Sequence, residues 1–172
     1  SEDGKIWINL PEDVNVKDKL KVKIKIADVY EKDLIVHPFN TNTMLRDASR
    51  LLRLSVKDVM ASAQKLFELG LITYHRTDSE RISEKGHEVA RRLLEKDFVK
   101  RTFGEGGAHE GIRITKPLRP EELRIYFEEL GIVAPLTKED FNLYKLIFNR
   151  FLASQTHPTK VKSVSYTHLR AH

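Results

Sequence analysis

The chain of 172 residues contains no cysteine, which excludes disulfide bonds, cysteine-ligated zinc and thiol catalysis within it. It has no apolar run near the roughly 20 residues that a membrane-spanning helix requires, and no signal-peptide pattern. Only Gln64 and Gln155 represent glutamine, against abundant lysine, arginine and glutamate. Because that balance is associated with proteins that work hot, we expect a thermophilic source as well as a cytoplasmic location.

The amino-acid composition is typical of a soluble, globular protein. Hydrophobic residues make up 40% of the chain and charged residues 32%, which is enough apolar material for one good core. The formal net charge is +5 and the sequence pI is near 9.3. Clustered lysine and arginine bind phosphates and release counterions, so this charge favours a polyanionic partner.

Two periodicities divide the chain. In residues 5–36 polar and apolar residues alternate, most clearly where lysines separate Val22, Ile24 and Ile26, and we expect two or three antiparallel strands there. The lysines are better explained by a solvated sheet face than by a DNA-facing surface. After Pro38 the spacing becomes helical, and a returning strand is expected over residues 161–169.

Capping residues delimit the expected helices. Asn42 or Thr43 is expected to cap a helix that runs to residue 52, and Ser55 opens a second that stops at Gly70. Further helices are expected over residues 83–98, 120–130 and 137–154. The fold class is therefore α+β, with a mainly α-helical, winged-helix-like domain over residues 39–156. Residues 1–38 and 157–172 are expected to be strands of a second, incomplete domain, and residues 165–172 fit the preceding pattern poorly, as a cloning-derived tail would.

A reactive cluster follows the second expected helix. Leu71-Ile72-Thr73-Tyr74 is typical of a short strand, and His75-Arg76-Thr77-Asp78-Ser79 follows it. A tyrosine, with a pKa of about 10, needs nearby cations to act as a nucleophile on phosphate, and Arg76 can supply one. In an extended segment Tyr74 and Arg76 would point to the same side. From the residues alone, a tyrosine at a strand edge beside an Arg–Asp surface pair is the favoured interpretation.

A family resemblance reverses that preference. Residues 70–79 resemble the signature around the active-site tyrosine of type IA DNA topoisomerases, and Ala108-His109-Glu110-Gly111-Ile112-Arg113 resembles a second block of that family. Gly111 and Ile114 depart from its usual alanine and proline. Similarity also covers the entry segment from Pro38 and the exit helix to Gln155. His75 and the run from Gly106 are most similar to reverse gyrases, in which a topoisomerase is fused to a helicase-like ATPase.

The resemblance implies roles for individual residues. It makes Tyr74 the nucleophile, Arg76 the group that stabilises the phosphate in the transition state, and His109 a group that hydrogen-bonds the phosphate or positions a neighbouring acid. The residues expected to contact DNA are Thr77, Asp78, Ser79 and Arg113. Without the family, His109 would be a loop histidine, Arg113 an exposed charge, and Asp78 a partner that holds Arg76 or caps a turn.

The resemblance also implies groups that this sequence does not supply. The family's reaction uses Mg²⁺ held by clustered carboxylates of a toprim domain, and reverse gyrase also uses ATP. The chain contains neither an Asp-x-Asp cluster nor a phosphate-binding P-loop, so we expect no cofactor here. The expected partners are single-stranded DNA and the toprim and helicase-like domains of the same polypeptide, with little turnover in isolation. The alternative is a non-enzymatic winged-helix DNA-binding module.

Overall fold

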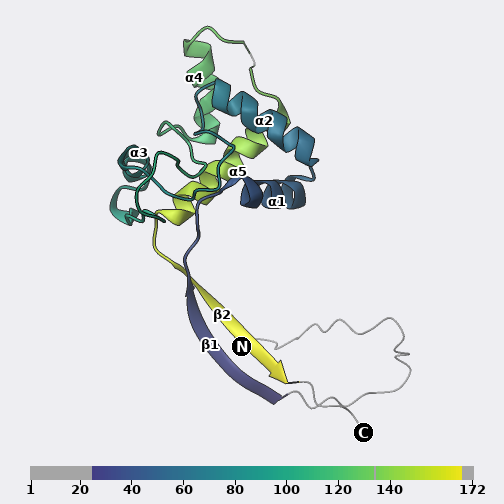
Figure 1. Cartoon of the computed structure of the whole chain (residues 1–172), viewed down its shortest axis with the longest axis vertical. Coiled ribbons are helices and arrows are strands. Elements are labelled where there is room, and N and C mark those ends of the chain that lie inside the picture. Colours follow the sequence, from purple (N-terminus) through teal and green to yellow (C-terminus); the bar gives the residue numbers. More distant parts are fainter. Residues whose placement is uncertain (1–24, 134, 168–172) are drawn as a thin grey trace, which may run out of the picture. The chain divides into compact units, whose positions relative to one another are not determined.

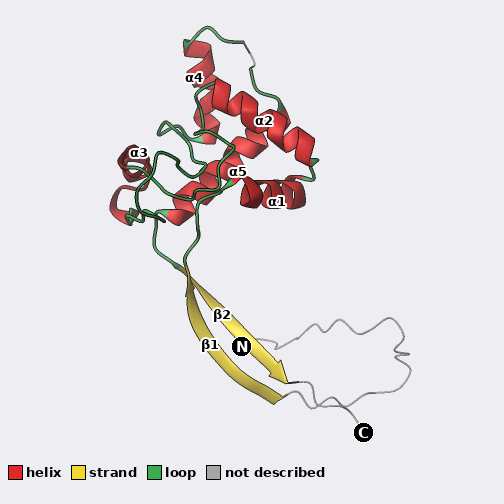
Figure 2. Cartoon of the chain, viewed as in Figure 1, coloured by secondary structure: helices red, strands yellow, loops and turns green. Residues whose placement is uncertain are grey.

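The structure is a computed structural model that describes residues 25–133 and 135–167 (Figure 1). Helices dominate it and the strands form one two-stranded sheet, which confirms the α+β class (Figure 2). The strands expected before residue 25 lie outside the described residues. In chain order the elements are β1 (Lys25–Leu34), α1 (Thr41–Leu52), α2 (Val56–Glu68), α3 (Glu84–Leu94), η1 (Glu95–Asp97), η2 (Pro120–Glu122), α4 (Leu123–Glu129), α5 (Lys138–Ser154) and β2 (Thr159–Thr167).

The chain divides into two compact units. One consists of residues 33–160 and holds all the helices named above, and the other consists of residues 1–32 and 161–172. Strands β1 and β2 are neighbours in the two-stranded sheet. No helix in the described ranges is both long and apolar enough to cross a membrane.

Polar residues at the helix starts set where the helices begin. Ser55 and Thr137 cap α2 and α5 as expected, since each hydroxyl accepts a hydrogen bond from the backbone N–H three residues later. The expected cap of α1 was wrong by two or three residues. Asn40 holds that position, because its side chain accepts from the Thr43 N–H at 2.9 Å while the Thr43 hydroxyl reaches back to the Asn40 N–H.

Helix α5 forms the centre of the helical unit and packs against α1, α2, α3 and η2 (Figure 1). Its buried face carries Leu143, Ile147 and Phe151. Asp140 in its first turn is also buried, and it accepts hydrogen bonds from Ser62 Oγ and Lys65 Nζ of α2, both at 2.6 Å. Burial on its own would raise the pKa of Asp140, but these hydrogen bonds leave it below its ordinary value.

The segment after α2 connects distant parts of the chain. Gly70, at φ +71°, ends the helix in the left-handed conformation that glycine adopts without strain. Ile72 then forms an isolated antiparallel bridge with Ile114, and Phe39 forms another with Ile112. All four side chains are buried. Because single bridges to remote residues stand where a winged helix has a hairpin, the winged-helix description is not confirmed.

Candidate active site

Tyr74 lies two residues after Ile72, which forms the bridge to Ile114, and is 49% exposed. Its ring packs edge-on against Phe67 of α2, with 5.2 Å between centroids, and lies 5.3 Å from the ring of His75. These two aromatic rings pack against the Tyr74 ring, while about half of the residue remains open to solvent. A tyrosine held in this way can meet a ligand without a rearrangement of the core.

The loop that follows Tyr74 is bent rather than extended. Residues 75, 76 and 78 are bends, so the extended geometry in which Tyr74 and Arg76 would point to the same side does not apply. The reason lies in Thr41, the first residue of α1, whose hydroxyl donates to the backbone oxygens of His75 at 2.7 Å and Thr77 at 3.0 Å. The same oxygen accepts from the Thr77 N–H at 2.8 Å, and the Thr41 N–H donates to the Thr77 oxygen. Thr41 therefore folds the loop onto the start of α1.

A cavity of about 390 Å³ opens at this loop. It is lined by four of the residues singled out from the sequence, together with Thr41: Arg76, Thr77, Asp78 and His109. His109 comes from a loop more than thirty residues away in sequence, which is held because its backbone oxygen accepts from Ser79 Oγ at 3.2 Å and from Arg81 Nε at 3.3 Å. Tyr74 lies two residues from Arg76 but is not among the lining residues.

The cavity offers groups suited to a phosphate. Arg76 makes no hydrogen bond or ion pair with another described residue, so its guanidinium donors are available for a ligand. Asp78 is the one carboxylate among the lining residues. Glu80, close by in sequence, is engaged by His37 Nδ1 at 2.8 Å. The lining thus combines a guanidinium, an imidazole and two hydroxyls with a single acid.

Arg113 lies apart from this cavity, in a buried ion pair. It is 4% exposed, and its Nε and Nη2 each donate to the Glu110 carboxylate at 3.0 Å. Its Nη1 donates to the Ile114 backbone oxygen, and Glu110 also accepts from the N–H of Ser83, the cap of α3. Contact between Arg113 and DNA stays a prediction, and it would require the guanidinium to leave Glu110.

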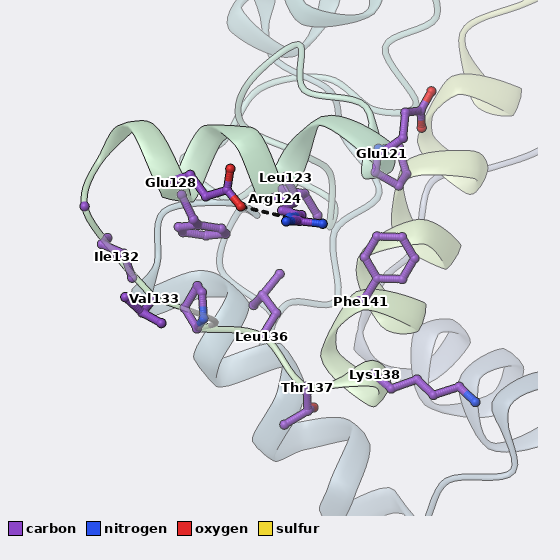
Figure 3. A pocket seen from close by; sticks show the side chains of 14 residues that line it. Glu121, Leu123, Arg124, Glu128, Ile132, Val133, Leu136, Thr137, Lys138 and Phe141 are labelled. Atoms are coloured by element: carbon purple, nitrogen blue, oxygen red, sulfur yellow. Dashed lines mark hydrogen bonds and ion pairs between the residues drawn. The ribbon is translucent and has the colours of Figure 1, made fainter.

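A larger hollow, of about 900 Å³, lies between α4 and the segment that joins α4 to α5 (Figure 3). Its lining is largely apolar, including Leu123, Leu136 and Phe141, and Arg124 and Glu128 form an ion pair at 2.8 Å on α4. It shares no residue with the cavity at Arg76. None of the residues singled out from the sequence lines this larger hollow, whereas four of them line the smaller cavity.

Comparison with known proteins decides the family. The sequence model of the DNA topoisomerase family matches residues 7–171. The chain belongs to the DNA topoisomerase family. Its type IA character is confirmed by full-length topoisomerase I from Thermotoga maritima, to which this topoisomerase chain is similar at 33% identity and a TM-score of 0.64. That match covers 83% of this chain and 24% of the other.

Reverse gyrases are prominent among the similar proteins, as His75 and the run from Gly106 indicated. Reverse gyrase 1 of Aquifex aeolicus is 52% identical over 131 residues, which covers 73% of this chain and 11% of that protein. Reverse gyrase of Pyrococcus furiosus is 44% identical over 152 residues, which covers 84% of this chain and 12% of that protein. This topoisomerase chain thus spans about a tenth of the length of these relatives, and the family match does not favour the non-enzymatic alternative.

Two features of the candidate site were missed by reasoning from the sequence. Thr41 stands in a segment that carries the resemblance, but nothing in its local pattern shows that it binds a loop 34 to 36 residues away. The sequence pattern indicated only that His75 resembles the residue found in reverse gyrases. His75 is 0% exposed, and neither ring nitrogen meets a hydrogen-bond partner among the described residues. Burial lowers the pKa of His75, nearby Arg76 lowers it further, and Glu68 opposes the shift.

Proposed function

We propose that this chain carries the DNA-cleaving tyrosine of a type IA topoisomerase, most like a reverse gyrase, and that Tyr74 is the nucleophile. The phenol oxygen of Tyr74 attacks a phosphorus of single-stranded DNA, the P–O3′ bond breaks, and a 5′-phosphotyrosine forms. The phenol loses its proton and the departing 3′ oxygen gains one, so a 3′-hydroxyl is released. Reversal of the attack reseals the strand, because the phosphodiester energy is retained in the adduct.

The observation that supports the proposal is the cavity at the loop that follows Tyr74, which Arg76 and His109 line from two loops distant in sequence. Negative charge that develops on the phosphate needs donors fixed in advance, and a guanidinium offers two parallel N–H groups to phosphate oxygens. We assign this role to Arg76. His109 is proposed to hydrogen-bond a second phosphate oxygen or to position Asp78. Thr77, Asp78 and Ser79 are proposed to border the path of the DNA strand.

We propose a positioning role for Arg113 in this reaction. Its pair with Glu110 joins the strand-like segment at Ile114 to the cap of α3, and Glu110 adjoins His109 in sequence. The pair therefore restrains the loop that brings His109 to the cavity. We propose that restraint of this loop is the main role of Arg113 and that contact with DNA is a lesser one.

Magnesium and ATP belong to the proposal for the whole protein. In the described ranges no three acidic or histidine side chains gather as metal ligands, and Asp78 stands as the one carboxylate of the cavity lining. The residues that line the cavity do not fit a magnesium site, because Mg²⁺ is held by several oxygen ligands and the lining supplies a single carboxylate. The toprim and helicase-like domains of the same polypeptide would supply the metal site and the ATP-driven coupling.

The position of a radioactive label on the DNA tests the chemistry. A longer polypeptide that joins this chain to the metal-binding domain would be mixed with a single-stranded oligonucleotide, and the reaction stopped with detergent. A label at the 3′ end should migrate with the protein, whereas a label at the 5′ end should appear in a free, shortened strand. The opposite distribution would contradict attachment through a 5′ phosphate.

A further inference from the structure

Three arginines in the described part of the chain stand out because they have no partner there. Arg50, Arg53 and Arg76 make no hydrogen bond or ion pair with another described residue. Every other described arginine side chain is held by a carboxylate or a backbone oxygen. Arg76 is accounted for by the proposed cleavage site, but Arg50 and Arg53 are not.

Arg50 and Arg53 lie at the C-terminal end of the first helix. Arg50 is in the last turn of α1, and Arg53 follows as its C-cap in the left-handed conformation, at φ +55°. Both are exposed, and so is Lys57 in the first turn of α2. The two arginines and Lys57 are called the α1 basic row below.

The charges around the α1 basic row are not balanced on α1 itself. The one acidic residue of α1, Asp47, is 7% exposed and is engaged by Arg46 Nε at 3.1 Å and Arg150 Nη1 at 3.3 Å. The nearest exposed carboxylate in sequence is Asp58 of α2, beside Lys57. Elsewhere exposed arginines are compensated, as where Arg91 and Arg92 of α3 both pair with Glu88. The end of α1 therefore presents uncompensated positive charge.

At its other end, the same helix is joined to the loop that follows Tyr74. Thr41, the first residue of α1, exchanges backbone and side-chain hydrogen bonds with Thr77 and lines the cavity with Arg76. At a rise of about 1.5 Å per residue, Arg53 lies roughly 18 Å from Thr41 along the helix axis. That span corresponds to several nucleotides of a DNA strand. A strand that enters the cavity and follows α1 would bring successive phosphates past Arg50 and Arg53.

We propose that the α1 basic row binds backbone phosphates of the DNA strand that is to be cleaved, several nucleotides from the scissile phosphate. The inference rests on the proposed function for the identity of the strand. The row acts through charge and is indifferent to base sequence, because guanidinium and ammonium groups contact phosphates and not base edges. Its task is to hold the strand while Tyr74 reacts, and it has no part in the chemical step.

The salt dependence of DNA binding measures how many phosphates the α1 basic row contacts. The affinity of the chain for a fluorescent single-stranded oligonucleotide would be measured by anisotropy from about 0.05 to 0.5 M salt. For single strands each phosphate contact contributes about 0.7 to the slope of log affinity against log salt. Arg50→Gln/Arg53→Gln removes two contacts and should reduce the magnitude of the slope by about 1.4. If the wild type and the variant bind equally at 1 M salt, the variant then binds roughly 25-fold more weakly at 0.1 M salt.

Two further variants separate charge from structure. Arg91→Gln/Arg92→Gln removes the same charge from exposed, paired arginines of α3 and should leave the slope almost unchanged. Arg50→Lys/Arg53→Lys keeps the charge and should keep the slope. An unchanged slope in Arg50→Gln/Arg53→Gln would overturn the proposal, and so would an equal loss in the α3 variant or a loss in the lysine variant.

Covalent trapping separates this inference from the proposed cleavage reaction. In the longer polypeptide, Arg50→Gln/Arg53→Gln should still form the DNA adduct when the oligonucleotide is saturating, because Tyr74 and its cavity are untouched. Tyr74→Phe should show the reverse, with the binding slope of the wild type and no adduct. A wild-type slope in Arg50→Gln/Arg53→Gln, together with loss of the adduct in Tyr74→Phe, would refute phosphate binding by the α1 basic row and support Tyr74 as the nucleophile.

Discussion

Replacing Arg113 by methionine should destabilise the helical unit strongly, because the change leaves the Glu110 carboxylate without its main partner. Arg113 donates two hydrogen bonds to Glu110, both at 3.0 Å, and its side chain is only 5% exposed. Methionine keeps much of the aliphatic length, so the loss is mainly that of the pair. Glu110 would keep the hydrogen bond from the Ser83 N–H at 2.9 Å.

The magnitude follows from the burial of the two groups. Removing one partner of a buried ion pair costs about 3–5 kcal/mol. Because the Glu110 side chain is 21% exposed and water can reach it, the lower end applies, about 3 kcal/mol. For a unit of this size that corresponds to a fall of roughly 10 °C in the thermal unfolding midpoint, measured by circular dichroism or calorimetry at pH 7.

The destabilisation caused by Arg113→Met should become smaller at acidic pH. Burial on its own would raise the pKa of Glu110, but the hydrogen bonds from Arg113 and Ser83 leave it below its ordinary value. A carboxyl whose folded pKa is lowered stabilises the fold above its unfolded pKa, near 4.5, and that stability is lost as the pH falls through the folded pKa. The penalty of Arg113→Met should therefore be complete at pH 7 and shrink below about pH 4.

The matched control is Arg124→Met, which breaks the ion pair with Glu128. Both partners of that pair are exposed, the side chains by 86% and 58%, so the unfolding midpoint should barely change. Equal shifts in the two variants would refute the reasoning, since burial would then have no bearing on the cost. A penalty for Arg113→Met that stays constant from pH 7 to pH 3 would also count against it.

Two further predictions concern Asp140 and His75. Asp140→Asn should lower the free energy of unfolding of the helical unit by about 2–3 kcal/mol, measured by urea unfolding, because Lys65 and Ser62 lose a buried carboxylate. Glu139→Gln is the control, since Glu139 is an exposed neighbour. Equal effects of the two substitutions would contradict the prediction. His75 has a lowered pKa, so the folded state disfavours its protonation, and wild-type stability should decline as the pH falls below about 6.5. His75→Met keeps a side chain of similar bulk without the ionisable group and should weaken that decline, whereas an identical melting profile from pH 7 to 5 in both proteins would rule out the role of the imidazole.

The helices could be predicted because each is specified by residues within it. Ser55 and Thr137 combine a capping hydroxyl with an apolar stripe, and both signals lie within one or two turns. The cap of α1 was misplaced because Asn40, Asn42 and Thr43 offer competing polar side chains. The choice among them is made by the Asn40–Thr43 exchange, together with the hydrogen bonds of Thr41 to the loop that follows Tyr74.

The site residues could be named from family motifs, but their arrangement depends on contacts that the local sequence does not encode. Thr41 bends the loop after Tyr74, so the alternation of an extended strand does not apply there. Arg113 looked like a surface charge and is buried instead, since Glu110 and the Ile114 carbonyl satisfy its donors. Each of these arrangements depends on partners that only the folded chain brings together.

The identity of the attached residue tests the central claim most directly. After covalent trapping with the longer polypeptide and nuclease digestion, trypsin should release residues 66–76, a peptide in which Tyr74 is the only tyrosine. Tandem mass spectrometry should find the nucleotide mass on Tyr74. A nucleotide on Thr73 or on any other residue, or an adduct that persists in Tyr74→Phe, would contradict the assignment of Tyr74 as the nucleophile.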